Sequence, residues 1–101
     1  MGRGLGSIME EIVRKELDTY LMMVNNWRNS YASWLEVPGG NDYVVEDLKE
    51  DISTYIAPKL QRFVNNEYIT PAEVKQFWYE LVKIVDDFAE VVRKFDGGEN
   101  V

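Results

Sequence analysis

Acidic residues are crowded into one ten-residue stretch of this sequence. Positions 42 to 51 hold a single base, Lys49, and five carboxylates, those of Asp42, Glu46, Asp47, Glu50 and Asp51. Carboxylate oxygens are preferred ligands of magnesium and calcium, and they also pair with the Lys and Arg side chains of a partner protein. Glu46/Glu50 and Asp47/Asp51 bring like charges together on a helix, which is unfavourable. The stretch therefore indicates a surface presented to a cation or a basic protein, or a solvated face at a helix start, where negative charge is favourable.

The absence of two residue types limits the chemistry. The chain of 101 residues contains no histidine and no cysteine, so it has no imidazole base, no thiolate nucleophile and no zinc–sulfur site. The acidic stretch also lacks the Asp-x-Asp-x-Asp-Gly spacing of a calcium-binding loop. An enzyme with this sequence would depend on carboxylates and a divalent cation. We therefore predict a protein that is not an enzyme and that binds no cofactor or metal.

Aromatic residues gather near the end of the first predicted helix. Trp27, Tyr31 and Trp34 recur at spacings of four and three, so they share one helical face. Such a row is typical of core packing. Tyr and Trp are also favoured anchors of protein–protein interfaces, so both interpretations stay open at this point.

Other apolar side chains exceed what one small core accommodates. Phe77, Trp78 and Tyr79 are consecutive, so they fan over about 200° of a helix and cannot all point inward. Met22 projects to the back of the first predicted helix. A group of exposed apolar residues marks self-association or a partner site. We predict a partner-binding set made of Met22, Phe77, Tyr79 and the five acids of the stretch 42–51.

The overall charge bears on the partner and on the location of the protein. Eighteen acidic and 11 basic residues give a net charge of −7, which disfavours direct binding to nucleic acid or to anionic membranes and steers the chain towards basic surfaces. No apolar run approaches the ~20 residues of a membrane span, and no apolar signal-peptide segment follows the N-terminal charge. Because the lack of cysteine also fits a reducing compartment, we expect a cytoplasmic protein.

The first predicted helix covers residues 7–35. Ser7 and Glu10 have the spacing of a capping box, in which each side chain bonds a free backbone amide at the helix start. Apolar residues then alternate at four and three positions from Val13 to Trp34, which is a heptad pattern. Pro38 and the two glycines after it end the helix. We expect the preceding residues 1–6 to be a flexible leader.

The middle predicted helix covers residues 42–66 and is irregular near Pro58. Its apolar residues before the proline share one face, and they are Val44, Val45, Leu48, Ile52 and Tyr55. In a straight helix, which turns about 100° per residue, Leu60 falls a quarter turn from that face while Lys59 and Arg62 point at the core. Pro58 also removes a hydrogen bond and clashes with the preceding turn. We therefore predict a kink or a break near Pro58.

The third predicted helix covers residues 70–95. Thr70 is the N-cap, Pro71 occupies the first helical position and Glu73 completes a capping box. Gly97 is expected to end the helix in a left-handed conformation. Three helices of similar length with short connections predict an all-α, up-down-up three-helix bundle. The bundle forms a single domain over residues 7–96, and a flexible tail follows at 97–101.

Three functions are compatible with this sequence. The favoured hypothesis is a non-enzymatic interaction module that binds a protein partner or forms a homo-oligomer, because seven-residue periodicity in two helices is typical of helical oligomers. An alternative is an acidic regulator whose carboxylates stand in for phosphates on the nucleic-acid-binding surface of a partner. The remaining alternative, an enzyme that uses a divalent cation, is disfavoured because no convergent catalytic set is visible.

Overall fold

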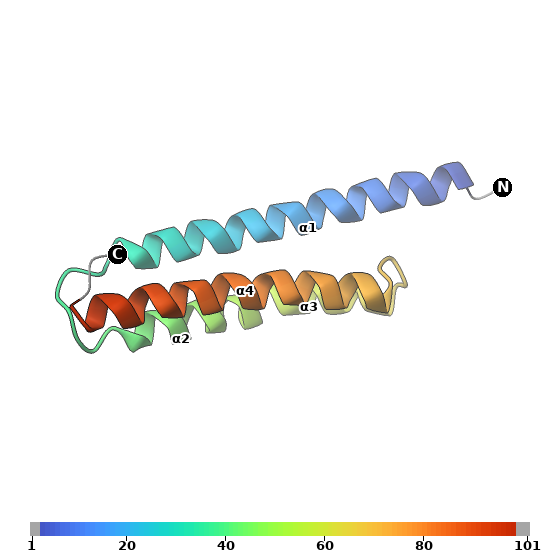
Figure 1. Cartoon of the computed structure of the whole chain (residues 1–101). Coiled ribbons are helices and arrows are strands. Elements are labelled where there is room, and N and C mark those ends of the chain that lie inside the picture. The colour runs from blue at the N-terminus through green and yellow to red at the C-terminus, as the bar shows by residue number, and fades with distance from the viewer. Residues whose placement is uncertain (1–2, 99–101) are drawn as a thin grey trace.

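Three helical rods lie side by side in the computed structural model, which describes residues 3–98. The first rod is α1 (Arg3–Ala32) and the third is α4 (Pro71–Asp96). The middle rod consists of α2 (Asp42–Asp51), the π-helical turn η1 (Ile52–Ile56) and α3 (Ala57–Asn65), which follow one another without a gap. α1 and α4 run in the same direction and the middle rod runs against both (Figure 1). The predicted all-α, up-down-up three-helix bundle is confirmed.

The apolar faces of the three rods meet in one core. Two of its residues come from α1, six from the middle rod and five from α4, and together they are Tyr20, Val24, Val44, Val45, Leu48, Ile52, Ile56, Leu60, Phe77, Leu81, Val85, Phe88 and Val92. Full burial of an apolar side chain of this size contributes about 1.5–3 kcal/mol. The apolar residues recur along one face of each rod, so these side chains meet in the core and their burial stabilises the bundle.

α1 differs from its predicted bounds at both ends. It begins at Arg3, so Ser7 lies inside the helix and the predicted capping box at Ser7 is wrong. The backbone of residues 3–6, which were expected to belong to a flexible leader, is helical, and residues 1–2 lie outside the described residues. The helix ends at Ala32 instead of residue 35. Beyond it the amides of Trp34 and Leu35 donate to carbonyls three residues back, which tightens the last turn.

The predicted irregularity near Pro58 takes the form of a π-helical turn. The amide of Ala57 donates to the carbonyl of Ile52, five residues back, so the turn holds one more residue than an α-helical turn. Pro58 accounts for its position, because a proline ring clashes with the carbonyl four residues earlier in a regular α-helix. Helical backbone angles continue through Ile56 and Ala57 into α3, so the middle rod remains one continuous element.

The π turn keeps one face of the middle rod apolar along its whole length. One extra residue rotates the following helix back by about 100° relative to a regular α-helix. Ile56 and Leu60 are therefore buried with the core residues of α2. Lys59 and Arg62, which a straight helix would aim at the core, are exposed. The expectation that Tyr55 shares the buried face is wrong, because Tyr55 lies in the π turn and is 55% exposed.

Both ends of α4 are defined by hydrogen bonds to the backbone. The Thr70 hydroxyl accepts from the Glu73 amide at 3.2 Å, and the Glu73 carboxylate accepts from the Thr70 amide at 2.9 Å, so the predicted capping box is confirmed. At the other end Gly97 has a φ of −80° and the positive φ occurs at Gly98. The predicted left-handed conformation of Gly97 is therefore wrong. Residues 99–101 of the predicted tail lie outside the described residues.

Asp96 ties the loop between α1 and α2 to the end of α4. One carboxylate oxygen accepts from the Gly39 amide at 2.8 Å and from the Asn41 side-chain amide at 2.6 Å, and the other accepts from the Asn41 backbone amide at 3.0 Å. The buried Asn41 side chain also donates to the Val37 carbonyl at 2.9 Å. Gly39 has a φ of +102°, which glycine adopts at no steric cost. This contact fixes where the middle rod starts relative to α4.

Replacing Asp96 with asparagine is expected to lower the melting temperature, because an amide offers only one acceptor oxygen to three donors. The hydrogen bonds from Asn41 and Gly39 hold the pKa of Asp96 below its usual range. The ionised Asp96 carboxylate therefore stabilises the folded state fully above the ordinary aspartate pKa of about 3.9. This stabilisation is lost as the pH falls through the lower pKa that Asp96 has in the folded state. Thermal unfolding from neutral to strongly acidic pH measures this. A difference between the two proteins that persists unchanged into strong acid would contradict the assignment.

Candidate interaction surface

Aromatic side chains line the junction between α1 and the middle rod. Two ring pairs cross this junction, with 5.9 Å between the centroids of Trp27 and Tyr55 and 6.3 Å between those of Tyr20 and Phe63. A third pair joins Tyr31 of α1 to Trp34, which lies just beyond the end of that helix, edge to face at 5.0 Å. We call this row the aromatic seam, and its members are Tyr20, Trp27, Tyr31, Trp34, Tyr55 and Phe63.

The bundle covers the aromatic seam only in part. Tyr20 is buried, and Trp27 and Tyr31 are half-buried. Trp34 and Tyr55 are 53% and 55% exposed. Core packing, one of the two interpretations of the row on α1, therefore does not describe Trp34. Trp34 and Tyr55 thus expose apolar area beside rings that are half-buried, and exposed aromatic rings of this kind are enriched at protein–protein contacts.

Acidic residues of α2 flank one end of the aromatic seam. The Tyr31 hydroxyl donates to the Asp51 carboxylate. This hydrogen bond, partial burial and the negative charges of Asp51, Asp47 and Glu50 raise the pKa of Tyr31 to about 12. All three carboxylates thus lie close enough to act on one hydroxyl group. We call Asp47, Glu50 and Asp51 the acidic end of the aromatic seam.

Basic residues of α3 flank the opposite end. Lys59 and Arg62 line an open hollow of about 300 Å³ against α1, and the Lys59 ammonium lies 5.3 Å from the centre of the Tyr20 ring, within cation–π range. Glu16 also lines the hollow and accepts a hydrogen bond from the Tyr20 hydroxyl at 2.9 Å. Burial, this bond and the Glu16 charge raise the pKa of Tyr20 to about 12. We call Lys59 and Arg62 the basic end.

The five acidic candidates predicted from the sequence do not act as one group. Asp47 and Asp51 are half-buried beside α1, with Glu50 near them. Glu46 pairs with Lys49 at 3.0 Å on the exposed face, where a salt bridge contributes about 0–1 kcal/mol. Asp42 is exposed in the first turn of α2. Among residues 3–98, no group of three or more carboxylates is arranged to hold a metal ion.

The three apolar candidates lie apart from the acids and from one another. Met22 is 59% exposed and lies about 200° around α1 from the buried Val24. Tyr79 is 65% exposed and lies about 200° around α4 from the buried Leu81. Phe77 is 3% exposed because it takes the inward position among the three consecutive aromatics. Its burial removes Phe77 from the surface that was predicted to bind a partner.

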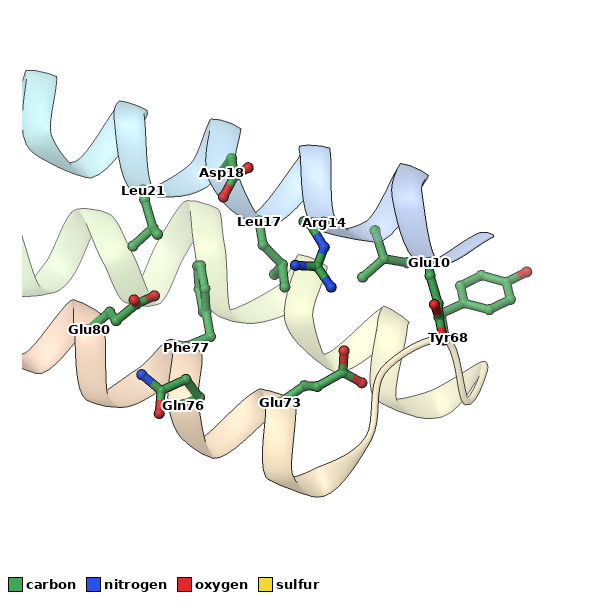
Figure 2. A pocket seen from close by; sticks show the side chains of 11 residues that line it. Glu10, Arg14, Leu17, Asp18, Leu21, Tyr68, Glu73, Gln76, Phe77 and Glu80 are labelled. Carbon is green, nitrogen blue, oxygen red and sulfur yellow. The ribbon is translucent and has the colours of Figure 1, made fainter. Parts of the chain in front are cut away.

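An open pocket lies between α1 and the start of α4, where α1 draws away from α4 towards its N-terminal end (Figure 1). Its volume is about 230 Å³. Figure 2 shows Leu17 and Leu21 of α1 pointing towards Phe77 of α4, with Arg14 and Glu73 nearer the α3–α4 connection. The polar groups that line it are mainly carboxylates, and no hydrogen bond joins a nucleophile to a base among them.

No protein-family model, curated protein or solved structure matches this chain. Within residues 3–98, no helix is both long enough and apolar enough to cross a lipid bilayer.

Sequence reasoning missed the contribution of the middle rod to this surface. Trp27, Tyr31 and Trp34 stand out by their spacing alone. Tyr55 and Lys59 do not, because their direction depends on the form of the irregularity at Pro58. The available signal was that Lys59 would face the core in a straight helix. A π turn rotates it outward onto the junction with α1, whereas a kink would leave its direction undetermined.

Proposed function

We propose that the chain is a non-enzymatic protein–protein interaction module that associates with itself through the aromatic seam. The observation that carries this proposal is the exposure of Trp34 and Tyr55 beside the half-buried rings of Trp27 and Tyr31. Removing apolar surface from water contributes about 25 cal/mol per Å². A second protein surface that covers these rings recovers that free energy.

The side chains of the aromatic seam are well suited to anchor a contact. Tyr and Trp bring a large rigid area with few rotatable bonds, and their polar atoms tolerate a wet boundary. The charged groups at the two ends keep the free surface hydrated and select the orientation of a partner. Protein interfaces commonly have aromatic residues at the centre, which dominate the binding energy, and charged residues at the rim.

Truncating the two exposed rings is expected to weaken self-association strongly. In the double variant Trp34→Ser with Tyr55→Ser, we expect a loss of at least about 30-fold, the equivalent of one hot spot of about 2 kcal/mol. Light scattering during size-exclusion chromatography, repeated over a range of concentrations, measures the association. The matched control is Tyr79→Ser with Val82→Ser, which removes exposed apolar side chains from α4. Equal losses in the two double variants would count against the aromatic seam as the contact surface.

The exposed acids of α2 support a second candidate function, an acidic regulator that occupies a basic surface of another protein. Asp42 and Glu50 are exposed, and neither forms a salt bridge among residues 10–98, the part of the chain whose side chains are described. Under this alternative a poly-arginine peptide binds, and its affinity falls steeply with salt. The variant Asp42→Lys with Glu50→Lys would then lose the peptide. Binding that is absent, or indifferent to salt, would exclude the regulator.

A further inference from the structure

Opposite charges occupy the two ends of the aromatic seam. The acidic end flanks Tyr31, whose hydroxyl donates to the Asp51 carboxylate, whereas the basic end flanks Tyr20. Asp51 and Lys59 lie on the same rod, about 12 Å apart along its axis. The contact between Trp27 and Tyr55 lies between the two ends. The surface therefore runs from negative through aromatic to positive.

We propose that two copies of the chain pair through their aromatic seams in antiparallel orientation, an inference that rests on the proposed function. A twofold axis perpendicular to the aromatic seam passes near Tyr55. The acidic end of each copy then faces the basic end of the other, and twofold symmetry repeats the contact on both sides of the axis. The aromatic rings occupy the centre, where the residues that dominate binding energy concentrate.

Charge decides between the antiparallel and the parallel orientation. Each chain carries a net charge of −7, so two copies repel one another unless opposite charges meet locally. A parallel pair places Asp47 and Glu50 against the same residues of the second copy. The antiparallel pair replaces this repulsion with two attractions. Lys59 lies over the Tyr20 ring, and neither Lys59 nor Arg62 forms a salt bridge among residues 10–98, whose side chains the structure describes. Both side chains are exposed, so a second copy can approach their charges.

The size of the surface is adequate for a stable pair. The side of α1 that borders the middle rod runs from Ile12, which is 50% exposed, to the end of the helix at Ala32, about 30 Å along the helix axis. The molecule is 20–21 Å wide. A contact that fills this length and the whole width of the molecule would approach the roughly 800 Å² per partner that specific complexes bury, so the pair must use the charged ends as well as the aromatic rings.

Complementary charge reversals test the orientation. In one variant the basic end is reversed by Lys59→Glu with Arg62→Glu, and in the other the acidic end is reversed by Asp47→Lys with Glu50→Lys. Each variant alone places like charges at both ends of the antiparallel pair, so we expect its self-association to weaken at least 10-fold. An equimolar mixture restores opposite charges at both contacts. We expect mixed dimers with an affinity within 10-fold of the wild type, measured by sedimentation velocity with one variant fluorescently labelled.

A control and two contrary outcomes complete this test. The control Lys75→Glu with Lys83→Glu changes the net charge as the reversal of the basic end does, but at exposed positions of α4. Once salt screens the added repulsion, its self-association should stay within about 3-fold of the wild type. A wild-type dimer whose two reversed variants do not combine would overturn the antiparallel orientation and leave the proposed function standing. A wild-type chain that is monomeric throughout would overturn both.

Cysteine pairs give a second readout that does not depend on charge reversal. The chain has no cysteine, so introduced thiols are the only ones that can cross-link. In a mixture of Glu50→Cys and Arg62→Cys, mild oxidation should yield mainly the mixed disulfide, because the antiparallel pair places position 50 of one copy near position 62 of the other. Cross-links that form mainly between identical variants would show the parallel orientation and overturn the inference.

Discussion

Replacing Phe88 with alanine is expected to lower the free energy of unfolding by about 3–5 kcal/mol. Phe88 is completely buried, and it is the largest of the fully buried side chains among the described residues. The guanidinium carbon of Arg28 lies 5.6 Å from the centre of its ring, so the substitution also removes a contact with α1. Domains of this kind have total stabilities of about 5–15 kcal/mol, and the loss would therefore be a large fraction of the whole.

Urea denaturation followed by circular dichroism measures this loss, with Val82→Ala as the matched control. Val82 lies on the same helix and is 52% exposed, so its truncation should change the free energy of unfolding by no more than about 0.5 kcal/mol. Similar midpoints for Phe88→Ala and Val82→Ala would show that the core does not lie where the structure places it.

Deleting a single residue is expected to have opposite outcomes in the middle rod and in α4. Deletion of Lys83 rotates the part of α4 after it by about 100° and turns Val85, Phe88 and Val92 away from the core. Each buried side chain lost in this way costs about 2–5 kcal/mol. The sum exceeds the total stability of a typical domain, so we expect this variant to be unfolded.

Deletion of Thr54 with Pro58→Ala should instead be tolerated. The π turn already holds one residue more than a regular α-helix needs, and the deletion makes the rod regular while the core faces before and after it stay aligned. Thr54 and Lys83 are both exposed, so the contrast does not arise from lost core contacts of the deleted side chains. Thermal unfolding of both deletion variants provides the measurement. If both fold, or both fail to fold, the π turn does not serve to align the two halves.

The general architecture was predictable because it depends on long periodic patterns. Each of the three rods repeats its apolar residues over many turns, and such repeats identify an element and its buried face. The helix ends were less predictable, as the two capping-box patterns show. Pro71 and the positive φ of 58° at Glu67 stop the chain from being helical before Thr70. Residues 3–6 contain no proline and no positive φ, and adding turns to an existing helix costs less than starting one, so α1 continues back to Arg3.

The candidate site was predictable only for the part that lies on α1. Trp27 and Tyr31 follow from spacing in one regular helix, and Trp34 follows in the tight turn after it. The direction of the Tyr55 and Lys59 side chains depends on how the backbone turns near Pro58. The sequence pattern shows that the apolar residues before and after Pro58 do not share a face in a regular helix, but it does not show whether a π turn, a kink or a break realigns them. The exposure of Tyr79 was predicted correctly, but this residue lies across the bundle from the aromatic seam. The spacing of residues along one helix shows which side chains point outward, but not which surfaces of neighbouring helices they adjoin.

Sedimentation equilibrium of the wild-type chain over a range of concentrations is the most direct test of the proposal that two copies cover each other's aromatic rings. We expect the apparent mass to rise with concentration from the 11.8 kDa of a single chain and to level off at twice that value, because a twofold pair is closed. A mass of 11.8 kDa at every concentration, or one that increases without limit, would contradict the proposal.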